Sequence, residues 1–235
     1  MRRWRSVCTA PDLPKGGDRG IHVFFVGSYG YRKGTDLIWP AIKKAFDDGT
    51  KVHLRMQCFT GLDGSHLESL IDQVRSLPDN IKVSVRPDTV SSEWMRRYYN
   101  QVDCVFTLSR GEGWCMPLYE GLYCEKPVIA PASTAMGECL PAAGVRRIEV
   151  RKKAISKIDD PFGDSIKAKY NTPTNGFWEP ELDDAASAFR DVYEESSAYS
   201  AQAKEGRKWL LETYSREKIA NRLDAIIEEV VTSIR

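Results

Sequence analysis

Two carboxylates, Glu112 and Glu120, flank a short mixed stretch in the segment SRGEGWCMPLYEG, residues 109–121. Carboxylates accept hydrogen bonds, and the hydroxyl groups of a sugar or a ribose donate them, so this pair suits a polyhydroxylated ligand. Taken singly, each acid also has a simpler interpretation. Glu120 would stabilise the N-terminus of a helix, and Glu112 would be an ordinary exposed charge.

The residues between the two acids predict a sharp turn followed by a helix. Gly111 and Gly113 allow the backbone to turn, and Pro117 suits the first helical position, where its missing N–H costs nothing. The free N–H groups of Cys115 and Met116 would then face an anion or a sugar oxygen.

A second loop, GSYGYRKGTD at residues 27–36, has the composition of a phosphate-binding turn. Gly27, Gly30 and Gly34 permit backbone angles that other residues resist, Lys33 is a compact cation, and Arg32 is a forked one. The following helix N-terminus would add free N–H groups, which together predict a diphosphate site. The order of residues is not that of a Walker loop, and a plain polar turn with a solvated Arg–Lys pair is the alternative.

Strand-like and helix-like segments alternate along the chain and would position these loops. Apolar, β-rich runs predict strands at residues 21–28, 51–58, 81–87, 103–109, 126–131 and 146–151. Apolar residues at helical spacing predict helices at residues 35–49, 65–77, 91–101, 117–125, 180–196, 199–214 and 215–235. Pro40 falls inside the first of these and would kink that helix or move its start.

This alternation predicts the α/β class with a doubly wound parallel sheet. We expect a polar N-terminal arm at residues 1–20 and one Rossmann-like domain at residues 21–235, closed by the C-terminal helices. The irregular stretch at residues 151–178 would form an ordered excursion or flap. Ligands of such sheets bind at the carboxyl ends of the strands, where both loops fall.

Composition excludes several other classes of function. The net charge of +1 gives no reason to expect nucleic acid as a partner, and no apolar run approaches the length of a transmembrane segment. Six cysteines without a C-x-x-C pair, and three scattered histidines, argue against a metal site. Without a secretory signal, the cysteine usage favours a reducing, cytoplasmic location.

The stretch GEGWCMPLYEGLYCEKPVIAP resembles the E-x7-E segment of the family-4 retaining glycosyltransferases, which have the GT-B fold. The stretch FVGSYGYRKGTDLI is similar to that family's G-R-L-x-x-x-K-G loop. GFWEPELDDAASAFRDVYEE is similar to the segment before the family's closing helices. The matches occur in the family's order over most of the chain.

The resemblance implies a role for each site residue. Lys33 would hold the diphosphate of a UDP-sugar or GDP-sugar donor, with Gly27 and Arg32 beside it. Glu120 would bind the ribose hydroxyls, and Glu112 would contact the transferred hexose. The remaining donor contacts would come from the backbone of Cys115, Met116 and Pro117, and from Arg86 near the base. Transfer would proceed with retention and without a bound metal or other cofactor.

Three positions depart from the family pattern. Ser28 stands where the family has a phosphate-binding arginine, which Arg32 would replace from the other side of the loop. Cys115 stands where glycine is usual and narrows the space for a sugar. Glu125 stands where a small residue is common, in a turn expected to be remote from the ligand.

A GT-B enzyme has two Rossmann-like domains, and this chain resembles only the C-terminal, donor-binding one. The acceptor is unknown, and its domain would come from another polypeptide or from a second copy of the chain. The alternatives are a nucleotide-sugar-binding module without transfer activity, and an interaction protein in which Lys33, Glu112 and Glu120 are surface charges.

Overall fold

The structure, a computed structural model, describes residues 20–58, 64–154 and 176–233. Its elements along the chain are β1 (Ile21–Val26), the 3-10 turn η1 (Tyr31–Lys33), α1 (Thr35–Ala45), β2 (Val52–Gln57), α2 (Gly64–Arg75), β3 (Ile81–Arg86), α3 (Ser92–Asn100), β4 (Cys104–Phe106), α4 (Met116–Tyr123), β5 (Val128–Pro131), α5 (Thr134–Cys139), β6 (Val145–Ile148), β7 (Val150–Ala154), β8 (Gly176–Pro180), α7 (Leu182–Glu194), α8 (Ser196–Tyr214) and α9 (Arg216–Ser233).

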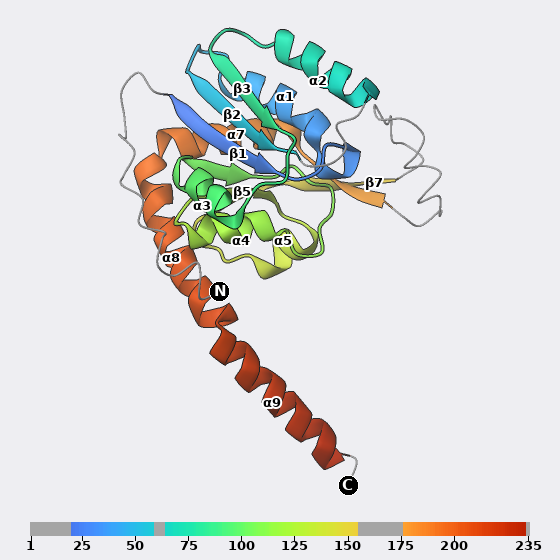
Figure 1. Ribbon diagram of the computed structural model, residues 1–235, viewed down its shortest axis with the longest axis vertical. Coiled ribbons are helices and arrows are strands. Elements are labelled where there is room, and N and C mark those ends of the chain that lie inside the picture. The colour runs from blue at the N-terminus through green and yellow to red at the C-terminus, as the bar shows by residue number, and fades with distance from the viewer. Residues whose placement is uncertain (1–19, 59–63, 155–175, 234–235) are drawn as a thin grey trace.

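Six parallel strands form the central sheet in the order β3-β2-β1-β4-β5-β6. The chain builds outward from β1 to β3, returns to β4 beside β1, and then builds outward in the other direction (Figure 1). The predicted α/β fold with a doubly wound parallel sheet is therefore confirmed. The point where the strand order reverses, between β1 and β4, is where ligands of such sheets bind.

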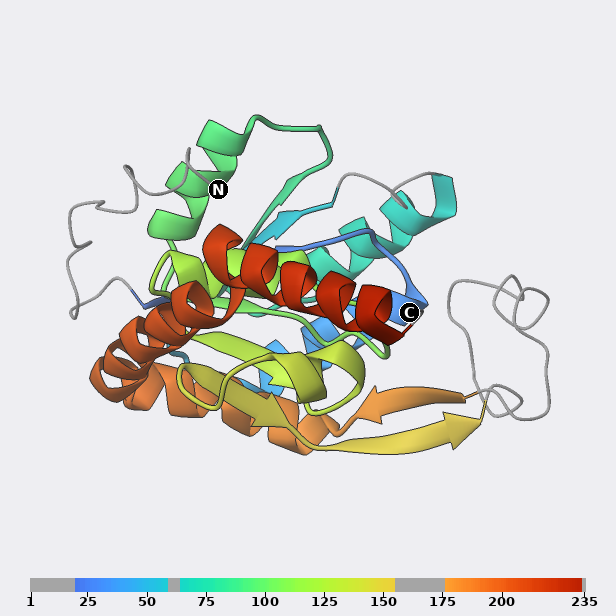
Figure 2. The ribbon, with the colours of Figure 1, turned by 90° about the horizontal axis from the view of Figure 1, so that it is seen from below.

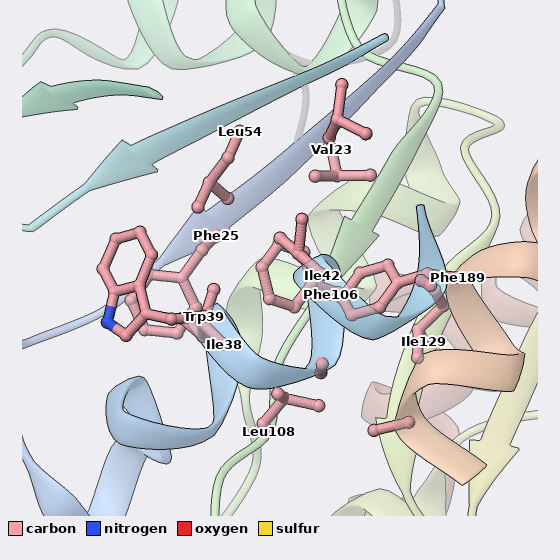
Figure 3. Close-up of a cluster of buried hydrophobic side chains, with 14 of the residues drawn as sticks. Val23, Phe25, Ile38, Trp39, Ile42, Leu54, Phe106, Leu108, Ile129 and Phe189 are labelled. Carbon is pink, nitrogen blue, oxygen red and sulfur yellow. The ribbon is translucent and has the colours of Figure 1, made fainter. Parts of the chain in front are cut away.

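Helices cover both faces of this sheet. Alternate residues of β1 point to opposite faces, so Val23 and Phe25 pack with α1 and α7, whereas Phe24 packs with α3 and α4. Figure 3 shows the first layer, where Ile38 and Ile42 of α1 meet Phe25, Phe106 of β4 and Phe189 of α7. Both layers are fully buried, as a doubly wound sheet requires.

Several element boundaries differ from the prediction. The stretch expected as one strand at residues 146–151 forms two, because the chain leaves the edge of the parallel sheet after Ile148. The residues after Glu149 form a separate strand, β7, which pairs antiparallel with β8 (Figure 2). The helix expected from residue 180 begins only at Leu182, since the preceding residues form β8.

The sequence left the effect of Pro40 open, and it did not predict the helix α5. Pro40 lies inside α1, and the helix still begins at Thr35, so the proline does not move its start. The short helix α5 was not predicted, because six residues rich in small side chains give no helical periodicity.

Part of the prediction lies outside the described residues. The predicted arm at residues 1–20 is described only at Gly20, and most of the predicted excursion at residues 151–178 is not described. In the described part of the chain, no helix combines the length and apolarity that a membrane crossing requires.

Candidate active site at the switch point of the sheet

The glycine- and lysine-containing loop after β1 and the loop after β4 lie against each other at the carboxyl edge of the sheet. The amide N–H of Arg110 donates to the carbonyl of Arg32 at 2.8 Å, and the Arg32 guanidinium donates to the carbonyl of Gly111 at 2.9 Å. Gly34 permits this contact, because it has a φ of 67° and a side chain there would strike the carbonyl of Leu108. The fold therefore joins two loops that lie far apart in the sequence.

Lys33 and Glu112 meet where the two loops join. The Lys33 ammonium donates to Glu112 Oε1 at 2.6 Å, and Nη1 of Arg32 lies 3.4 Å from the same oxygen. The Glu112 side chain is only 9% exposed and that of Lys33 is 17% exposed, whereas the Arg32 side chain is 43% exposed. The carbon chain of Lys33 runs beside Gly27, where an added Cβ would lie 3.6 Å from it.

Two residues that follow β5 also hold the backbone of Glu112. Its N–H donates to Oγ1 of Thr134 at 3.2 Å, and its carbonyl accepts a weaker bond from Ala135 at 3.4 Å. Thr134 has a φ of 51°, in the left-handed region that is unfavourable for residues other than glycine. The first residues of α5 thus fix Glu112 beside the two cations.

The turn between the two glutamates differs in detail from the prediction. Gly111 and Gly113 do not adopt positive φ; the left-handed residue is Cys115, with a φ of 62°. Cys115 is the N-cap of α4, so Pro117 occupies the second helical position instead of the first. Among the described residues, no acceptor is found for the N–H groups of Cys115 and Met116, as expected at a helix N-terminus.

Glu120 lies in the second turn of α4 and is oriented by a residue that sequence analysis missed. The hydroxyl of Tyr99 on α3 donates to Glu120 Oε2 at 2.6 Å. Burial raises the pKa of Glu120 above its ordinary value, and the bond from Tyr99 opposes this shift. No hydrogen bond to its other oxygen, Oε1, is found within the described residues.

Arg110 is a second residue that the sequence analysis passed over. Its buried guanidinium donates to the carbonyl of Tyr31 and lies 3.6 Å from the centre of the Tyr31 ring. It pairs with both carboxylate oxygens of Asp36, at 2.8 and 2.7 Å, and with both oxygens of Glu179 on β8. Every N–H of the guanidinium is engaged, so Arg110 braces the loops and is not free to bind a ligand.

Arg86 lies apart from this group. It ends β3, the edge strand, and β2 and β1 separate it from β4. Its guanidinium lies 4.8 Å from the centre of the Trp94 ring. The structure thus brings together Gly27, Arg32, Lys33 and Glu112, puts Cys115 to Glu120 on the adjoining helix, and leaves Arg86 at the edge.

The missed residues left little signal in the sequence. Tyr99 is one of two adjacent tyrosines in an amphipathic helix, and nothing in its spacing points to Glu120. Arg110 carried a weak signal, because an arginine directly after the apolar run DCVFTLS needs partners if it is buried. Among the described residues, no group of three or more His, Cys, Asp or Glu side chains is arranged to hold a metal ion.

Fold and site together define a Rossmann-like α/β protein with cations and carboxylates at the switch point of its sheet. The chain belongs to the family described as glycosyl transferases group 1, whose model matches residues 15–146. No curated protein matches the chain by sequence.

Solved structures of similar fold extend over nearly the whole chain. Sucrose-phosphate synthase from Thermosynechococcus elongatus matches 99% of the chain with a TM-score of 0.62 at 15% identity. Anabaena HepE in complex with UDP-glucose matches 88% with a TM-score of 0.61 at 13% identity. This chain covers 49% of the length of each of these two.

One solved structure of a single domain matches most of this chain and most of its own length. The C-terminal domain of LpcC, a glycosyl transferase group 1 family protein from Francisella tularensis, has a TM-score of 0.59 at 16% identity. That match covers 83% of this chain and 87% of that domain. The chain is therefore similar to a glycosyltransferase C-terminal domain, as its resemblance implied.

Proposed function

We propose that this chain is the donor-binding half of a glycosyltransferase that transfers a hexose from a UDP-sugar or GDP-sugar. The observation that carries the proposal is the meeting of Lys33, Arg32 and Glu112 at the switch point, with Glu120 on the adjoining helix. Cations beside the N-terminus of α4 suit a diphosphate, and the two carboxylates suit hydroxyl groups on either side of it.

In this proposal each residue acts on one part of the donor. Lys33 and Arg32 hold the diphosphate, and they stabilise its charge as the bond to the anomeric carbon breaks. Oε1 of Glu120 accepts from the ribose, and Glu112 positions the hexose or stabilises its oxocarbenium-like charge. The backbone of Cys115, Met116 and Pro117 lines the sugar and phosphates.

The proposal includes retention at the anomeric carbon, independence from a metal cofactor and a cytoplasmic location. We also propose that Arg86 lies near the base, which would then extend from the switch point toward the carboxyl end of β3. The acceptor-binding half would lie outside these 235 residues. UDP-glucose in HepE supports a uridine donor as the first probe.

Two measurements test this proposal. UDP or GDP should raise the melting temperature of the chain, because a ligand that binds only the folded state stabilises it. Glu112→Ala should lower donor hydrolysis or transfer by about 10²-fold or more, and chelation of metals should leave the rate unchanged. The exposed acid Glu138, changed to Ala, is the matched control.

A nucleotide-sugar-binding module without transfer activity is the second candidate. The observation that favours it is Ser28, which stands where the family that the chain resembles has a phosphate-binding arginine. In that case the nucleotide would still raise the melting temperature, while no donor turnover would be measured with any variant. No thermal shift with either nucleotide at millimolar concentration would contradict both candidates.

A further inference from the structure

Thr134, the first residue of α5, has a backbone conformation that its side chain disfavours. Its φ of 51° lies in the left-handed region, where a side chain branched at Cβ crowds the backbone. Among the described residues other than glycine, only Cys115 and Glu125 also have a positive φ. Such a conformation persists where the contacts around it require it, and it is typical of functional sites.

The hydroxyl of Thr134 contacts the candidate donor site. Its Oγ1 accepts from the N–H of Glu112 at 3.2 Å, and the next residue, Ala135, donates its N–H to the Glu112 carbonyl at 3.4 Å. Glu112 stands between Gly111 and Gly113, where an added Cβ would meet no atom of the described chain within 4 Å beyond its neighbours in sequence. Because glycine restricts the backbone little, the two bonds to α5 restrain the position of Glu112.

The hydroxyl, and not the backbone conformation, explains a threonine at this position. A glycine would adopt the same φ without strain, but it has no hydroxyl to accept from Glu112. The neighbouring Ser133 also carries a buried hydroxyl, yet its Oγ has no hydrogen-bond partner among the described residues. Thr134 therefore combines an unfavourable backbone with a contact that neither glycine nor the adjacent serine supplies.

We propose that Thr134 is a positioning residue for Glu112 and, through it, for the transferred hexose; this inference rests on the proposed function. In the free chain the Glu112 carboxylate pairs with Lys33 at 2.6 Å. Once a diphosphate binds Lys33, the carboxylate turns toward the hexose about a backbone that Thr134 holds in place. Side-chain torsions then change while the backbone does not, so the geometry of the hexose contact is set in advance.

The Thr134 hydroxyl should act on the hexose and not on the nucleotide. Lys33 and Arg32 lie on the loop after β1, and Glu120 lies on α4, so deletion of a hydroxyl on α5 leaves these nucleotide contacts in place. Loss of the positioning of Glu112 should therefore appear in the affinity for a sugar nucleotide and not in the affinity for the nucleotide alone.

Calorimetry on the full chain with UDP-glucose and with UDP tests the proposal; GDP-glucose and GDP are used if the chain binds guanosine nucleotides. Thr134→Ala and Thr134→Gly should each weaken binding of the sugar nucleotide about 3- to 10-fold and change that of the nucleotide less than about twofold. Thr134→Ser keeps the hydroxyl and should bind both ligands like the unmodified chain. Ser133→Ala, which deletes the neighbouring hydroxyl, is the matched control.

Thermal unfolding separates positioning from stability. Both variants lack the hydroxyl, but glycine relieves the left-handed backbone, so Thr134→Gly should melt above Thr134→Ala while binding the sugar nucleotide equally weakly. In a Glu112→Ala background, Thr134→Gly should cause no further loss of affinity, because Thr134 acts through that side chain. A structural role alone would make affinity follow the melting temperature and would persist without the Glu112 side chain.

The outcomes distinguish this inference from the proposed function. Absence of nucleotide binding by the unmodified chain would contradict the proposed function, and this inference with it. A chain that binds the nucleotide but not the sugar nucleotide overturns the inference alone. The same holds if the Thr134 variants leave sugar-nucleotide affinity unchanged, weaken the binding of both ligands equally, or cause a loss that persists in the Glu112→Ala background.

Discussion

Two ionic clusters lie within the same pair of loops and differ in how completely their charges are paired. Arg110 is buried, and all of its N–H groups bond to Tyr31, Asp36 or Glu179. Within the described residues, the Lys33 ammonium has one hydrogen bond, to Glu112, and its neighbour Arg32 is partly exposed. The first cluster has no capacity left for a ligand, whereas the second retains donors that a diphosphate would use.

The comparison shows that a cluster of charged side chains is not by itself evidence of a ligand-binding site. Both clusters pair cations with carboxylates at the edge of the sheet. Burial alone would raise the pKa of Glu179, but hydrogen bonds from Arg110 outweigh it and hold that pKa below its ordinary value. Unused hydrogen-bonding capacity at Lys33 and Arg32 distinguishes the candidate ligand site from the structural cluster around Arg110.

The largest effect should come from breaking the buried cluster. Arg110→Met leaves Asp36 and Glu179 without their cation and should lower the free energy of unfolding by about 3–5 kcal/mol. Arg32→Met, at a partly exposed position, should cost no more than about 1 kcal/mol. Urea unfolding of both variants measures the difference, and equal losses would remove the distinction between the two clusters.

The next effect concerns pH and the charge of Glu120. Because burial raises its pKa, the carboxyl takes up a proton at a higher pH than an ordinary glutamate does. The affinity for UDP-glucose, whose doubly esterified diphosphate does not titrate near neutral pH, should therefore be greatest at neutral pH and fall as the pH drops through that raised pKa. Calorimetric titration from pH 7 downward measures this fall, and Glu120→Gln should abolish it. An unchanged pH profile in that variant would exclude Glu120 as the group responsible.

Removal of the Tyr99 hydroxyl should have a smaller effect on the donor site. Tyr99→Phe keeps the ring against Phe24 and deletes the bond to Glu120, so nucleotide affinity should fall about 3- to 10-fold. The loss should vanish for an analogue without the ribose 2′ and 3′ hydroxyls. Tyr98→Phe, which deletes the neighbouring hydroxyl, is the control. A similar loss in both variants would mean that the effect does not act through Glu120.

The smallest effect should arise outside both clusters, at Glu125. Its φ of 56° favours glycine, and its carboxylate pairs with Arg207 at 2.7 Å. Glu125→Gly should stabilise the fold by about 0.5 kcal/mol, because relief of the left-handed backbone exceeds the loss of a surface ion pair. Glu125→Ala loses the pair without that relief and should destabilise it slightly. Thermal unfolding measures both, and altered nucleotide affinity in either would contradict the expected remoteness of this turn.

The sequence predicted what depends on periodicity and on local turn chemistry. The strand and helix alternation and the two loops follow from residues close together in the chain. The sequence did not predict the division of residues 146–151 between two sheets, because that depends on a partner strand formed by residues 176–180.

The missed site residues have the same cause. Tyr99 and Glu120 are 21 positions apart, and Arg110 and Glu179 are 69 apart, so their contacts exist only in the folded chain. Residue types and spacing gave Lys33, Glu112 and Glu120 as candidates, and the resemblance implied a role for each, but neither indicated that Lys33 and Glu112 pair with each other. The residue types also placed the turn at Gly111 and Gly113, whereas Cys115 has the left-handed backbone.

The ion pair between Lys33 and Glu112 allows the most direct test of the proposed donor site. If Lys33 binds the donor diphosphate, Glu112 competes for it in the free protein, so two variants should change nucleotide affinity in opposite directions. Calorimetry with UDP or GDP should show that Lys33→Met weakens binding about tenfold or more and that Glu112→Gln strengthens it. Absence of nucleotide binding by the unmodified chain, or equal weakening in both variants, would contradict the assignment of this cluster to a diphosphate.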